Sequence, residues 1–448
     1  MKYAVITFGC RVNQSDSHGV EEQLLSRGAE PAPAEAADVV VVNTCTVTAS
    51  ADQGARQTIR RIARVNPRAR IVVTGCYATR EPDAVRQLPN VEHVVCNDDK
   101  PQLLTLLRPG AGPLTQDDPG GLTSSERYGD GDGACGTVLK PGLAGRTAFT
   151  LRVQTGCAEA CSYCIIPGTR GAPRSLSLDA ACREVQRVVR AGFKEVVLTG
   201  VHLGSWGRDL ERPASLLTLL RALHELAARE HADHDRRVLF RISSLEPMDC
   251  TRDLVDLVAA SPYFAPHFHL PLQHASASVL RAMRRPYDVG LYATLVDDIR
   301  ARLPHASIGS DIIVGFPGEQ EADVQELTTY LNTSPLTHLH VFPYSDRPGT
   351  EASTLRARPP GPAVKAWGDE VRRIGAALNR RFLASQVGTC HRALTLEDGT
   401  LAVTGNYLKA RIAAGRPRNA WVQLRIRQTV PVIEADVIDA ASPDSTQP

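Results

Sequence analysis

The sequence contains little that would place the protein in a membrane or outside the cell. The chain has 448 residues. No apolar run reaches the roughly eighteen residues that a transmembrane helix needs. The opening MKYAVITFGCRVNQ lacks the basic segment and apolar core of a secretory signal. We therefore expect a cytoplasmic protein with no membrane partner.

Two further absences narrow the function. The sequence has no G-x-x-x-x-G-K-[ST] phosphate loop, and its G-x-G-x-x-G match, GDGACG at residues 131–136, lies in a segment rich in Gly and Asp rather than between a strand and a helix, which argues against nucleotide hydrolysis. Its eleven cysteines are an odd number spread along a long chain, so a disulfide framework is not expected. The net charge of +2 indicates no particular partner. The cysteines that form motifs are therefore interpreted as metal ligands.

The most specific motif is a set of three cysteines in VQTGCAEACSYCIIPGTRG. Cys157, Cys161 and Cys164 follow an apolar strand candidate at spacings of four and three residues. Structural zinc and most electron-transfer clusters have four protein ligands, so three thiolates favour a four-iron cluster with one exchangeable iron. A zinc loop is the alternative. The spacing, with Tyr163 before the last cysteine, resembles the radical S-adenosylmethionine superfamily, in which the open iron binds the amino acid end of the cofactor.

The first hundred residues repeat an apolar strand, a cysteine and a helix. AVITFGC ends at Cys10, DVVVVNTC at Cys45 and RIVVTGC at Cys76, with separations of 35 and 31 residues, about one βαβ unit. This alternation predicts an α/β domain with a doubly wound parallel sheet, whose strand ends meet at one edge. We expect the three cysteines to meet there and hold a second cluster. The alternative is three buried cysteines that act as small apolar side chains.

Cys96 could bring a fourth thiol to the same edge, because VEHVVC ends a further strand candidate. We nevertheless expect three ligands. The remaining cysteines are isolated and are interpreted as structural or incidental: Cys135, Cys182, Cys250 and Cys390.

Residues 108–146 are rich in Gly, Pro and Asp and predict a flexible linker between domains. Beyond it, six strand candidates alternate with helical stretches: FTLRVQTGC, KEVVLTG, VLFRISSLEP, HFHLPLQH, SIGSDIIVGFPG and HLHVFPYS. Six such units fit a partial (β/α)6 barrel of the kind that the radical superfamily shares, with chemistry at the carboxyl ends of the strands. The expected domains are 1–107, 147–376 and 377–440, followed by a tail at 441–448.

The same resemblance implies further contacts with the cofactor. Gly200 is expected near its methionyl part, Ser243 and Glu246 on the ribose side, and residues 312–317 against the adenine; Tyr163 is a further candidate contact. The alternative for each is a turn or strand end that only completes the barrel.

Arg170 and Arg174 in GTRGAPRS are candidate contacts for a carboxylate or phosphate, since a guanidinium can form paired hydrogen bonds with either. Ordinary surface arginines are the alternative.

Three histidines cluster in HFHLPLQHAS. His267 and His269 should point the same way on a strand, and His274 follows. Metal binding is possible for such a set, but hydrogen-bonded histidines inside the barrel are the favoured interpretation. Gln273, at the strand exit, is the better active-site candidate.

The last segment predicts a small β-barrel. Its strand candidates are HRALTLED, TLAVTGNYLKARI, NAWVQLRIR and VPVIEADVI. Between residues 380 and 430 there are nine Arg or Lys residues against two acidic ones, and aromatic side chains accompany them. Such a barrel is typical of nucleic-acid binding, the alternative being a solvated basic face without a ligand.

The chain as a whole resembles the methylthiotransferase family, which joins an amino-terminal cluster domain, a radical barrel and a carboxyl-terminal TRAM domain. The resemblance rests on the six cysteines and on DIIVGFPGE, FPYSDRPGT and GTLAVTGNY. TFGCRVNQ and NTCTVT look most like the branch that modifies threonylcarbamoyladenosine next to the anticodon of tRNA. Sibling branches act on isopentenyladenosine or on a ribosomal protein. His274 departs from a usual serine, and Cys96 from a common glycine.

The resemblance implies an enzyme with two [4Fe-4S] clusters and S-adenosyl-L-methionine. One cluster would cleave this cofactor to a 5′-deoxyadenosyl radical, and the other would supply sulfur for methylthiolation at C2 of the adenine. Expected partners are the anticodon stem-loop of tRNA and an electron donor such as flavodoxin or ferredoxin. The alternatives of other classes are an RNA-binding redox sensor and a radical enzyme that modifies a protein.

Overall fold

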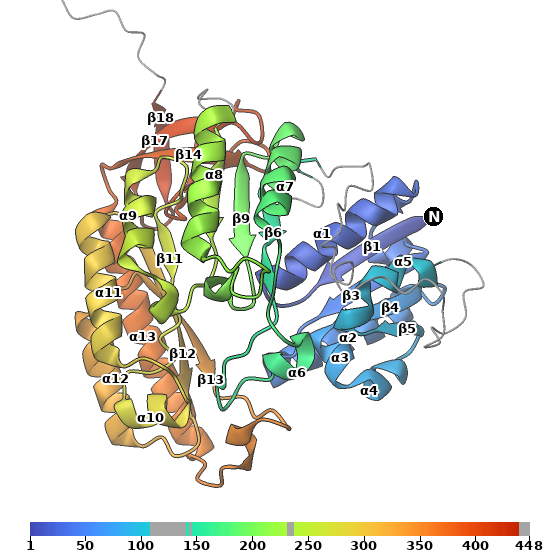
Figure 1. Ribbon diagram of the computed structural model, residues 1–448, viewed down its shortest axis with the longest axis horizontal. Helices are drawn as coiled ribbons and strands as arrows, with labels where there is room; N and C mark the ends of the chain where they lie inside the picture. Colours follow the sequence, from blue (N-terminus) through green and yellow to red (C-terminus); the bar gives the residue numbers. More distant parts are fainter. Residues whose placement is uncertain (108–139, 143–145, 231–236, 439–448) are drawn as a thin grey trace, which may run out of the picture.

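The computed structural model describes residues 1–107, 140–142, 146–230 and 237–438 (Figure 1). Most of the expected linker, the isolated Cys135 and the expected tail lie outside the described residues. Among the described residues, no helix is both long and apolar enough to cross a membrane. The chain forms an N-terminal parallel sheet, a larger set of parallel strands and a C-terminal barrel. The α/β fold class expected from the sequence is confirmed.

The N-terminal sheet has five parallel strands in the order β2-β1-β3-β4-β5. They are β1 (Lys2–Thr7), β2 (Glu30–Pro31), β3 (Val39–Thr44), β4 (Arg70–Gly75) and β5 (Val91–Val95). The helices are α1 (Arg11–Ser26), α2 (Ala49–Val65), α3 (Cys76–Arg80), α4 (Pro82–Arg86) and α5 (Leu103–Leu106), with 3-10 turns η1 (Ala34–Ala36) and η2 (Asn97–Gln102).

Successive residues of the central strands pack into separate hydrophobic cores. Val40 packs on one face with Ile59 of α2, while Val41 packs on the other with Leu24 of α1. The run VVVV is therefore apolar throughout, because helices cover both faces of the sheet. The doubly wound arrangement predicted for this segment is confirmed.

The central part contains the six predicted parallel strands. Two three-stranded sheets, β10-β9-β6 and β11-β12-β13, are linked by parallel bridges between Phe240 and Phe264 and between Ser244 and His269. The strands are β6 (Phe149–Arg152), β9 (Glu195–Thr199), β10 (Leu239–Ile242), β11 (His267–His269), β12 (Ser307–Val314) and β13 (His338–Pro343). Together they form the partial barrel that the sequence predicts.

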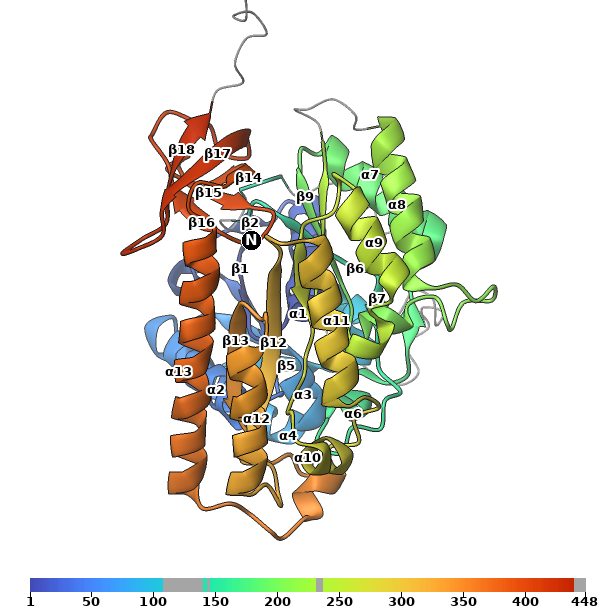
Figure 2. The same cartoon turned by 90° about the vertical axis from the view of Figure 1, so that its left-hand side faces the viewer.

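Helices cover the outside of this barrel (Figures 1 and 2). They are α7 (Leu178–Arg190), α8 (Leu216–Glu230), α9 (Arg252–Ala260), α10 (Ala277–Ala282), α11 (Val289–Arg302), α12 (Glu321–Thr333) and α13 (Gly361–Ser385), with 3-10 turns η4 (Leu203–Ser205), η5 (Pro247–Asp249) and η6 (Glu351–Thr354). Phe268, Ile308 and Ile312 belong to the core beneath them. The alternate strand residues therefore face the barrel interior.

The C-terminal part is a closed barrel in the order β14-β15-β16-β18-β17. Its strands are β14 (Cys390–Leu396), β15 (Leu401–Thr404), β16 (Lys409–Arg411), β17 (Trp421–Gln428) and β18 (Glu434–Ile438). The predicted single strand TLAVTGNYLKARI is wrong, because a turn divides it into β15 and β16. In that turn Thr404 Oγ1 bonds to Asn406 Oδ1 at 2.6 Å, and Tyr407 adopts a φ of 67°. Gly405 and Asn406 are ordinary turn residues.

The C-terminal barrel lies at the end of the central barrel where its strands begin (Figure 2). Trp421 Nε1 donates to Arg237 O at 2.9 Å, and Asn406 Nδ2 donates to His305 O at 2.8 Å. Arg237 lies two residues before β10, and His305 lies two residues before β12. Helix α13 crosses the domain boundary that was expected between residues 376 and 377, and it ends shortly before β14 of the C-terminal barrel. The carboxyl ends of the central strands thus remain open toward the cysteine loop.

Candidate iron–sulfur and cofactor site

The three N-terminal cysteines follow three neighbouring strands of the first sheet. Cys10 lies between β1 and α1, Cys45 follows β3, and Cys76 begins α3 after β4. Strand order reverses between β1 and β3, the position at which doubly wound sheets bind ligands. Burial, together with the neighbouring thiols of Cys10 and Cys76, raises the pKa of Cys45 to about 12. The structure therefore brings these three cysteines together, as the strand pattern predicts.

Two glycines allow the strand exits to approach one another. At Gly9, with a φ of 89°, a Cβ would lie 2.6 Å from Cys45 Sγ. At Gly75, with a φ of 96°, it would lie 2.2 Å from Thr44 O. Side chains at either position would be strained and would also clash. Thr44 Oγ1 accepts a hydrogen bond from Ala78 N at 3.2 Å and ties the exit of β3 to α3.

A buried network of charges surrounds Cys76. Asp16 of α1 pairs with Lys100, Arg152 and Arg170, and these cations hold its pKa well below the ordinary range although burial acts in the opposite direction. Burial also disfavours the Cys76 thiolate, but Arg170 and Lys100 outweigh it and lower the pKa of this thiol. The thiolate is the form that ligates iron. The surroundings of Cys76 thus suit a metal ligand.

Arg170 lies inside the protein rather than on its surface. It ends α6 (Ile166–Arg170), the short helix that follows Cys164, and its side chain is 1% exposed. Its Nη2 donates to Asp16 Oδ2 at 3.1 Å and to Asn13 Oδ1. The carboxylate contact expected of Arg170 is therefore made within the protein. Arg174 lies beside it and donates to Arg170 O at 3.3 Å.

Cys96 follows β5, but its electrostatic neighbours differ from those of the other three thiols. Burial and then Asp99 raise the pKa of Cys96, whereas Cys45 interacts with Cys10 and Cys76. The next residue, Asn97, is the one that points into the group, with Nδ2 3.6 Å from Cys76 Sγ. This placement supports a set of three ligands.

The barrel cysteines lie in the loop between β7 (Gln154–Thr155) and α6. An antiparallel pair of β7 with β8 (Arg174–Ser175) closes the loop at its base. Cys157 N donates to Gly171 O, and Cys164 N donates to Cys161 O, both at 3.1 Å. Burial and the thiols of Cys161 and Cys157 raise the pKa of Cys164 to about 12. The three sulfur atoms therefore share one small region.

Arg285 is a cationic side chain at this second cysteine set. Its Nη1 donates to Cys161 Sγ at 3.1 Å, and its Nη2 pairs with Glu246. Its Nε donates to Tyr287 Oη at 3.0 Å, and Tyr287 in turn donates to Pro271 O at 2.7 Å. Arg285 is thus fixed from several sides, and it reduces the cost of negative charge on Cys161.

His202 is a second cation beside the loop. Its Nε2 lies 2.7 Å from Asp249 Oδ2, and its Nδ1 lies 3.6 Å from Glu159 Oε1. Burial acts to lower the pKa of His202, but hydrogen bonds with Asp249 and Cys157 outweigh burial and raise it to about 10. The imidazole is therefore protonated at neutral pH.

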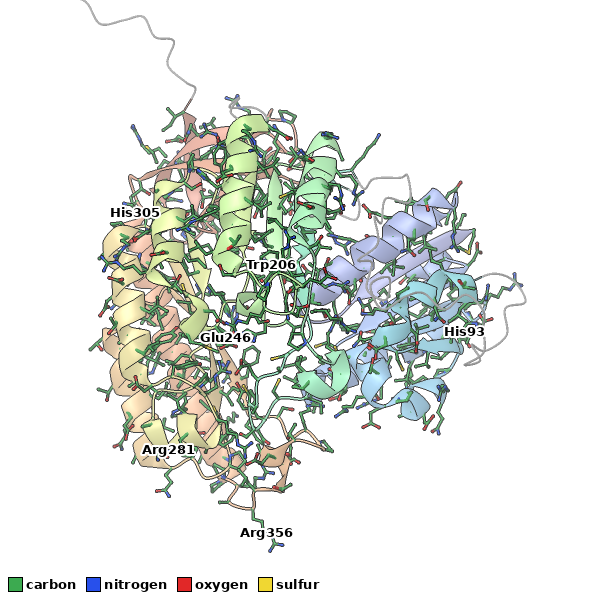
Figure 3. All side chains as sticks on the ribbon, in the orientation of Figure 1. His93, Trp206, Glu246, Arg281, His305 and Arg356 are labelled. Carbon is green, nitrogen blue, oxygen red and sulfur yellow. The ribbon has the colours of Figure 1, made fainter. Side chains whose placement is uncertain are left out.

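The expected cofactor contacts lie around the same opening. Tyr163 packs edge-on against Phe316 at the end of β12, with ring centroids 6.5 Å apart. A Cβ at Gly200 would lie 2.9 Å from Gln154 Oε1, and Ser243 Oγ donates to Thr199 Oγ1 at 3.2 Å. Glu246 lies near the centre of the molecule (Figure 3).

The end of β12 is positioned by a buried pair that sequence reasoning did not foresee. His274 Nδ1 accepts from Ser276 N at 3.0 Å, which leaves Nε2 to donate to Glu319 Oε1 at 3.2 Å. Glu319 Oε2 accepts from the backbone of Gly315 and Phe316, at 2.5 and 2.8 Å. His274, which stands where the family usually has serine, thus helps to fix the end of β12, the segment expected to contact the adenine of the cofactor. Gln273 forms a bridge to Ile312 there.

The predicted histidine group does not form as a set of three, because His274 turns to Glu319. His267 packs against Tyr407 at 4.6 Å, and His269 Nε2 lies 3.1 Å from Asp311 Oδ1. Two histidines of HLHVFPYS lie next to His269 instead. They are His338 and His340, the first and third residues of that segment, and they face the same interior. The same alternation that indicated His267 and His269 could have identified them.

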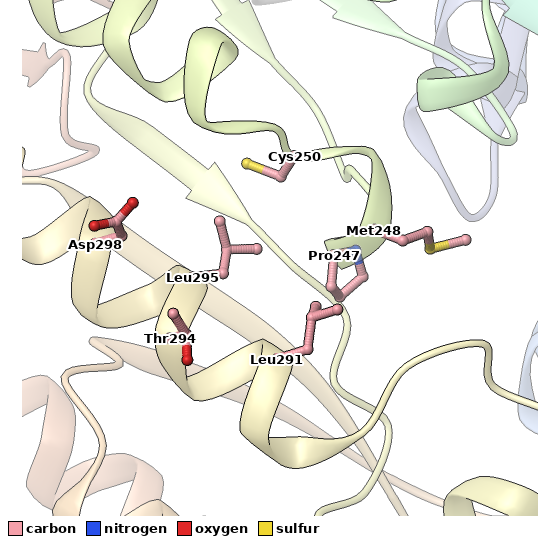
Figure 4. A pocket seen from close by; sticks show the side chains of 7 residues that line it. All are labelled: Pro247, Met248, Cys250, Leu291, Thr294, Leu295 and Asp298. Atoms are coloured by element: carbon pink, nitrogen blue, oxygen red, sulfur yellow. The ribbon is translucent and has the colours of Figure 1, made fainter.

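A separate pocket of about 340 Å³ lies outside the barrel, between η5 and α11 (Figure 4). Its lining includes Met248, Cys250 and Leu295. None of the six motif cysteines lines it, so it is distinct from the site described above.

Two family models match separate parts of the chain. Residues 2–97 match the uncharacterized protein family UPF0004, and residues 151–331 match the radical SAM superfamily. Among solved structures, the radical S-adenosylmethionine methyltransferase TsrM from Kitasatospora setae aligns with a TM-score of 0.53 at 17% identity, covering 76% of this chain and 72% of that one. That likeness concerns the fold alone.

Curated relatives cover nearly the whole chain. Threonylcarbamoyladenosine tRNA methylthiotransferase MtaB of Aquifex aeolicus is 37% identical over 91% of this chain and 96% of its own. A tRNA-2-methylthio-N(6)-dimethylallyladenosine synthase of Corynebacterium glutamicum is 34% identical, over 81% and 68%. Ribosomal protein uS12 methylthiotransferase RimO of a Roseiflexus species is 29% identical over the full length of both chains. The chain belongs to the radical S-adenosylmethionine methylthiotransferases.

Proposed function

We propose that this enzyme methylthiolates C2 of threonylcarbamoyladenosine next to the anticodon of tRNA. The observation that carries the proposal is the pairing of two separate three-cysteine sets through one short segment, α6, which begins beside Cys164 and ends at Arg170 near Cys76. The residues around Cys10 and Cys45, TFGCRVNQ and NTCTVT, support the threonylcarbamoyladenosine branch. The 37% identity to a relative of that name supports the same substrate.

The barrel set fits a four-iron cluster with an open iron. Cys157, Cys161 and Cys164 supply three thiolates, and the basic groups beside them, Arg285 and His202, offset their negative charge. When bound, such a cluster supplies the electron that cleaves S-adenosylmethionine. A small electron carrier such as flavodoxin or ferredoxin is the proposed source of that electron.

The side chains around the opening would orient S-adenosylmethionine and exclude water. Gly200 leaves room for the methionyl end, because any side chain there would meet Gln154. Ser243 and Glu246 lie after β10 for the ribose, and Glu246 is kept in place by Arg285. The β12 end, fixed by Glu319, would line the adenine. This positioning is the protein's part of the reaction, since the cofactor supplies the difficult chemistry.

The N-terminal set fits a second cluster that donates sulfur. Cys10 is exposed whereas Cys45 and Cys76 are buried, so a cluster held by these three would have one accessible side. Arg170, Lys100 and Asn97 would stabilise it through Cys76. We assign the sulfur to this set because the barrel set is needed for cofactor cleavage.

The C-terminal barrel is the proposed tRNA-binding part. Lys409 and Arg411 on β16 and Arg425 on β17 are exposed. Arg392 lies over the ring of Trp421, 3.8 Å from its centroid, so an aromatic and a cation share one surface. Such combinations bind nucleic-acid backbones and bases.

Mass spectrometry of tRNA nucleosides tests the substrate. A strain that lacks the gene should lose the 2-methylthio derivative of threonylcarbamoyladenosine and accumulate the unthiolated nucleoside. Wild-type protein should restore the product, and Cys45→Ala should not, which separates loss of chemistry from loss of the gene. Loss of the methylthio form of a dimethylallyl or isopentenyl adenosine instead would assign the chain to that branch. Unchanged nucleosides with an altered mass of ribosomal protein uS12 would assign it to the protein-modifying branch.

A further inference from the structure

A group of metal-ligand side chains lies in the barrel interior, apart from the six cysteines. His269 comes from β11, Asp311 from β12 and His340 from β13, so three adjacent parallel strands each supply one residue. Their neighbours Phe268, Ile312 and Val341 pack outward into the core beneath the helices. The three side chains therefore point to the same interior face.

The ligand atoms converge on one point. His269 Nε2 and His340 Nδ1 lie 3.1 and 3.2 Å from the same atom, Asp311 Oδ1. All three ligand atoms lie within 4.8 Å of one another. Ligands at about 2.1 Å from a metal ion are separated by about 3.0–3.4 Å at octahedral or tetrahedral angles. The two separations from Asp311 Oδ1 match this range, and the third, between the two imidazole nitrogens, is at most 4.8 Å.

The surroundings favour a cation there. The carboxylate of Asp311 lies within hydrogen-bonding distance of both His269 and His340. The ring of a third histidine, His338, lies 6.2 Å from the ring of His269 and 5.6 Å from that of His340. The site thus holds a carboxylate among imidazoles, and only His269 of the three ligands is largely buried.

Access and space are also provided. The side chains of Asp311 and His340 are 27% and 56% exposed, so an ion can enter from solvent. Gly309, on the same face of β12, leaves room for the histidines, because a Cβ there would lie 2.0 Å from His338 Nε2. A larger residue at this position would push the imidazole of β13 out of the interior.

We propose that His269, Asp311 and His340 bind a divalent transition-metal ion such as Zn²⁺. Two imidazoles and one carboxylate are a common ligand set for such ions and leave further coordination positions open. The site does not use the iron–sulfur cysteines, and it is independent of which nucleoside or protein the enzyme modifies.

Zinc binding to the enzyme with both clusters in place tests the proposal. The protein is incubated with a small excess of ZnCl2, desalted, and analysed for zinc and iron in the same sample, so that loss of clusters is detected. Wild type should retain about one zinc ion per chain. Asp311→Asn and His340→Gln should bind zinc at least tenfold more weakly, whereas His305→Gln, an exposed histidine outside the group, should match wild type.

X-ray absorption at the zinc edge of the wild-type protein identifies the ligands without relying on a variant. The expected spectrum has imidazole and oxygen neighbours at about 2.0–2.1 Å. Sulfur neighbours at about 2.3 Å would mean that zinc sits on thiols, and would overturn the proposal. Equal zinc contents in wild type, Asp311→Asn and His340→Gln would overturn it as well.

Discussion

Arg170 and Asp16 form an ion pair of 3.1 Å whose side chains are only 1% and 2% exposed. Arg170 belongs to the segment that follows the barrel cysteines, and Asp16 belongs to the helix that follows Cys10. The same guanidinium lowers the pKa of Cys76. One residue therefore joins the loop of the barrel set to the surroundings of the N-terminal set, and a change there should affect the second set more than the first.

Substitution Arg170→Gln should weaken iron binding at the N-terminal cysteines. Asp16 keeps Lys100 and Arg152, so the expected loss of folding stability is about 1–3 kcal/mol rather than complete unfolding. After anaerobic reconstitution, iron should fall from about eight toward about four atoms per chain, while cleavage of S-adenosylmethionine persists. Arg212→Gln, at an exposed position, is the matched control. Full iron content in Arg170→Gln would contradict the assigned role.

Single cysteine substitutions should separate the two sets. Cys161→Ala should abolish production of 5′-deoxyadenosine, because a thiolate ligand of the barrel set is lost. Cys45→Ala should retain 5′-deoxyadenosine production but give no methylthiolated product. Cys390→Ala, an exposed and isolated thiol, should behave as wild type in both assays. Abundant methylthiolated product from Cys45→Ala would defeat the sulfur-donor assignment.

Substitution at His274 should act through the end of β12. His274→Ala removes the partner of the fully buried Glu319, which costs about 1–3 kcal/mol of folding stability. Glu319 also holds Gly315 and Phe316, so the KM for S-adenosylmethionine should rise several-fold. His274→Gln can still donate to Glu319 and should recover part of both losses. Denaturant titration measures the loss of stability, and a cofactor-cleavage assay measures the KM. An unchanged KM in His274→Ala would show that the pair of His274 and Glu319 does not affect binding of the cofactor.

The elements that could be predicted are those whose sequence pattern matches their burial. Val39–Thr44 reads as a buried strand because helices cover both of its faces, and its exit at Cys45 follows directly. Helix α1 is different, since it buries Asn13, Ser17 and Glu21. These polar groups are satisfied by partners far along the chain, such as Arg146 for Glu21. No local pattern can indicate such pairs.

The candidate site shows the same limit. Its six cysteines could be found because their spacing is local or repeats with the βαβ unit. Arg285 and His202 could not, because Arg285 reaches Cys161 from a segment 124 residues away and His202 is held by Asp249. Arg170 could be named as an anion-binding residue, but its partner Asp16 emerges only when the two domains pack together.

Charge reversal on β16 should weaken RNA binding. Lys409 and Arg411 are exposed, and each phosphate contact that is lost should lower the salt dependence of binding by about 0.7–0.9 in the log–log slope. We expect Lys409→Glu combined with Arg411→Glu to reduce affinity for a tRNA anticodon stem-loop at least tenfold at low salt. Arg373→Glu on α13, equally a charge reversal at an exposed residue, should change it far less. An unchanged slope in the double variant would place the RNA elsewhere.

Stability should depend on pH through His18 of α1, whose side chain packs against Phe149 of β6. Its ring lies 5.4 Å from Phe149, and burial followed by Arg146 lowers its pKa to about 3. The unfolded chain therefore takes up a proton near pH 6.5 while the folded protein does not, so stability is full above that pH and falls as the pH decreases toward about 3. At about 1.4 kcal/mol per pH unit, wild type should lose about 2 kcal/mol more than His18→Leu between pH 7.5 and 5.0. Urea titrations at both pH values measure this difference, with His305→Gln as the control; parallel losses in wild type and His18→Leu would show that His18 does not contribute.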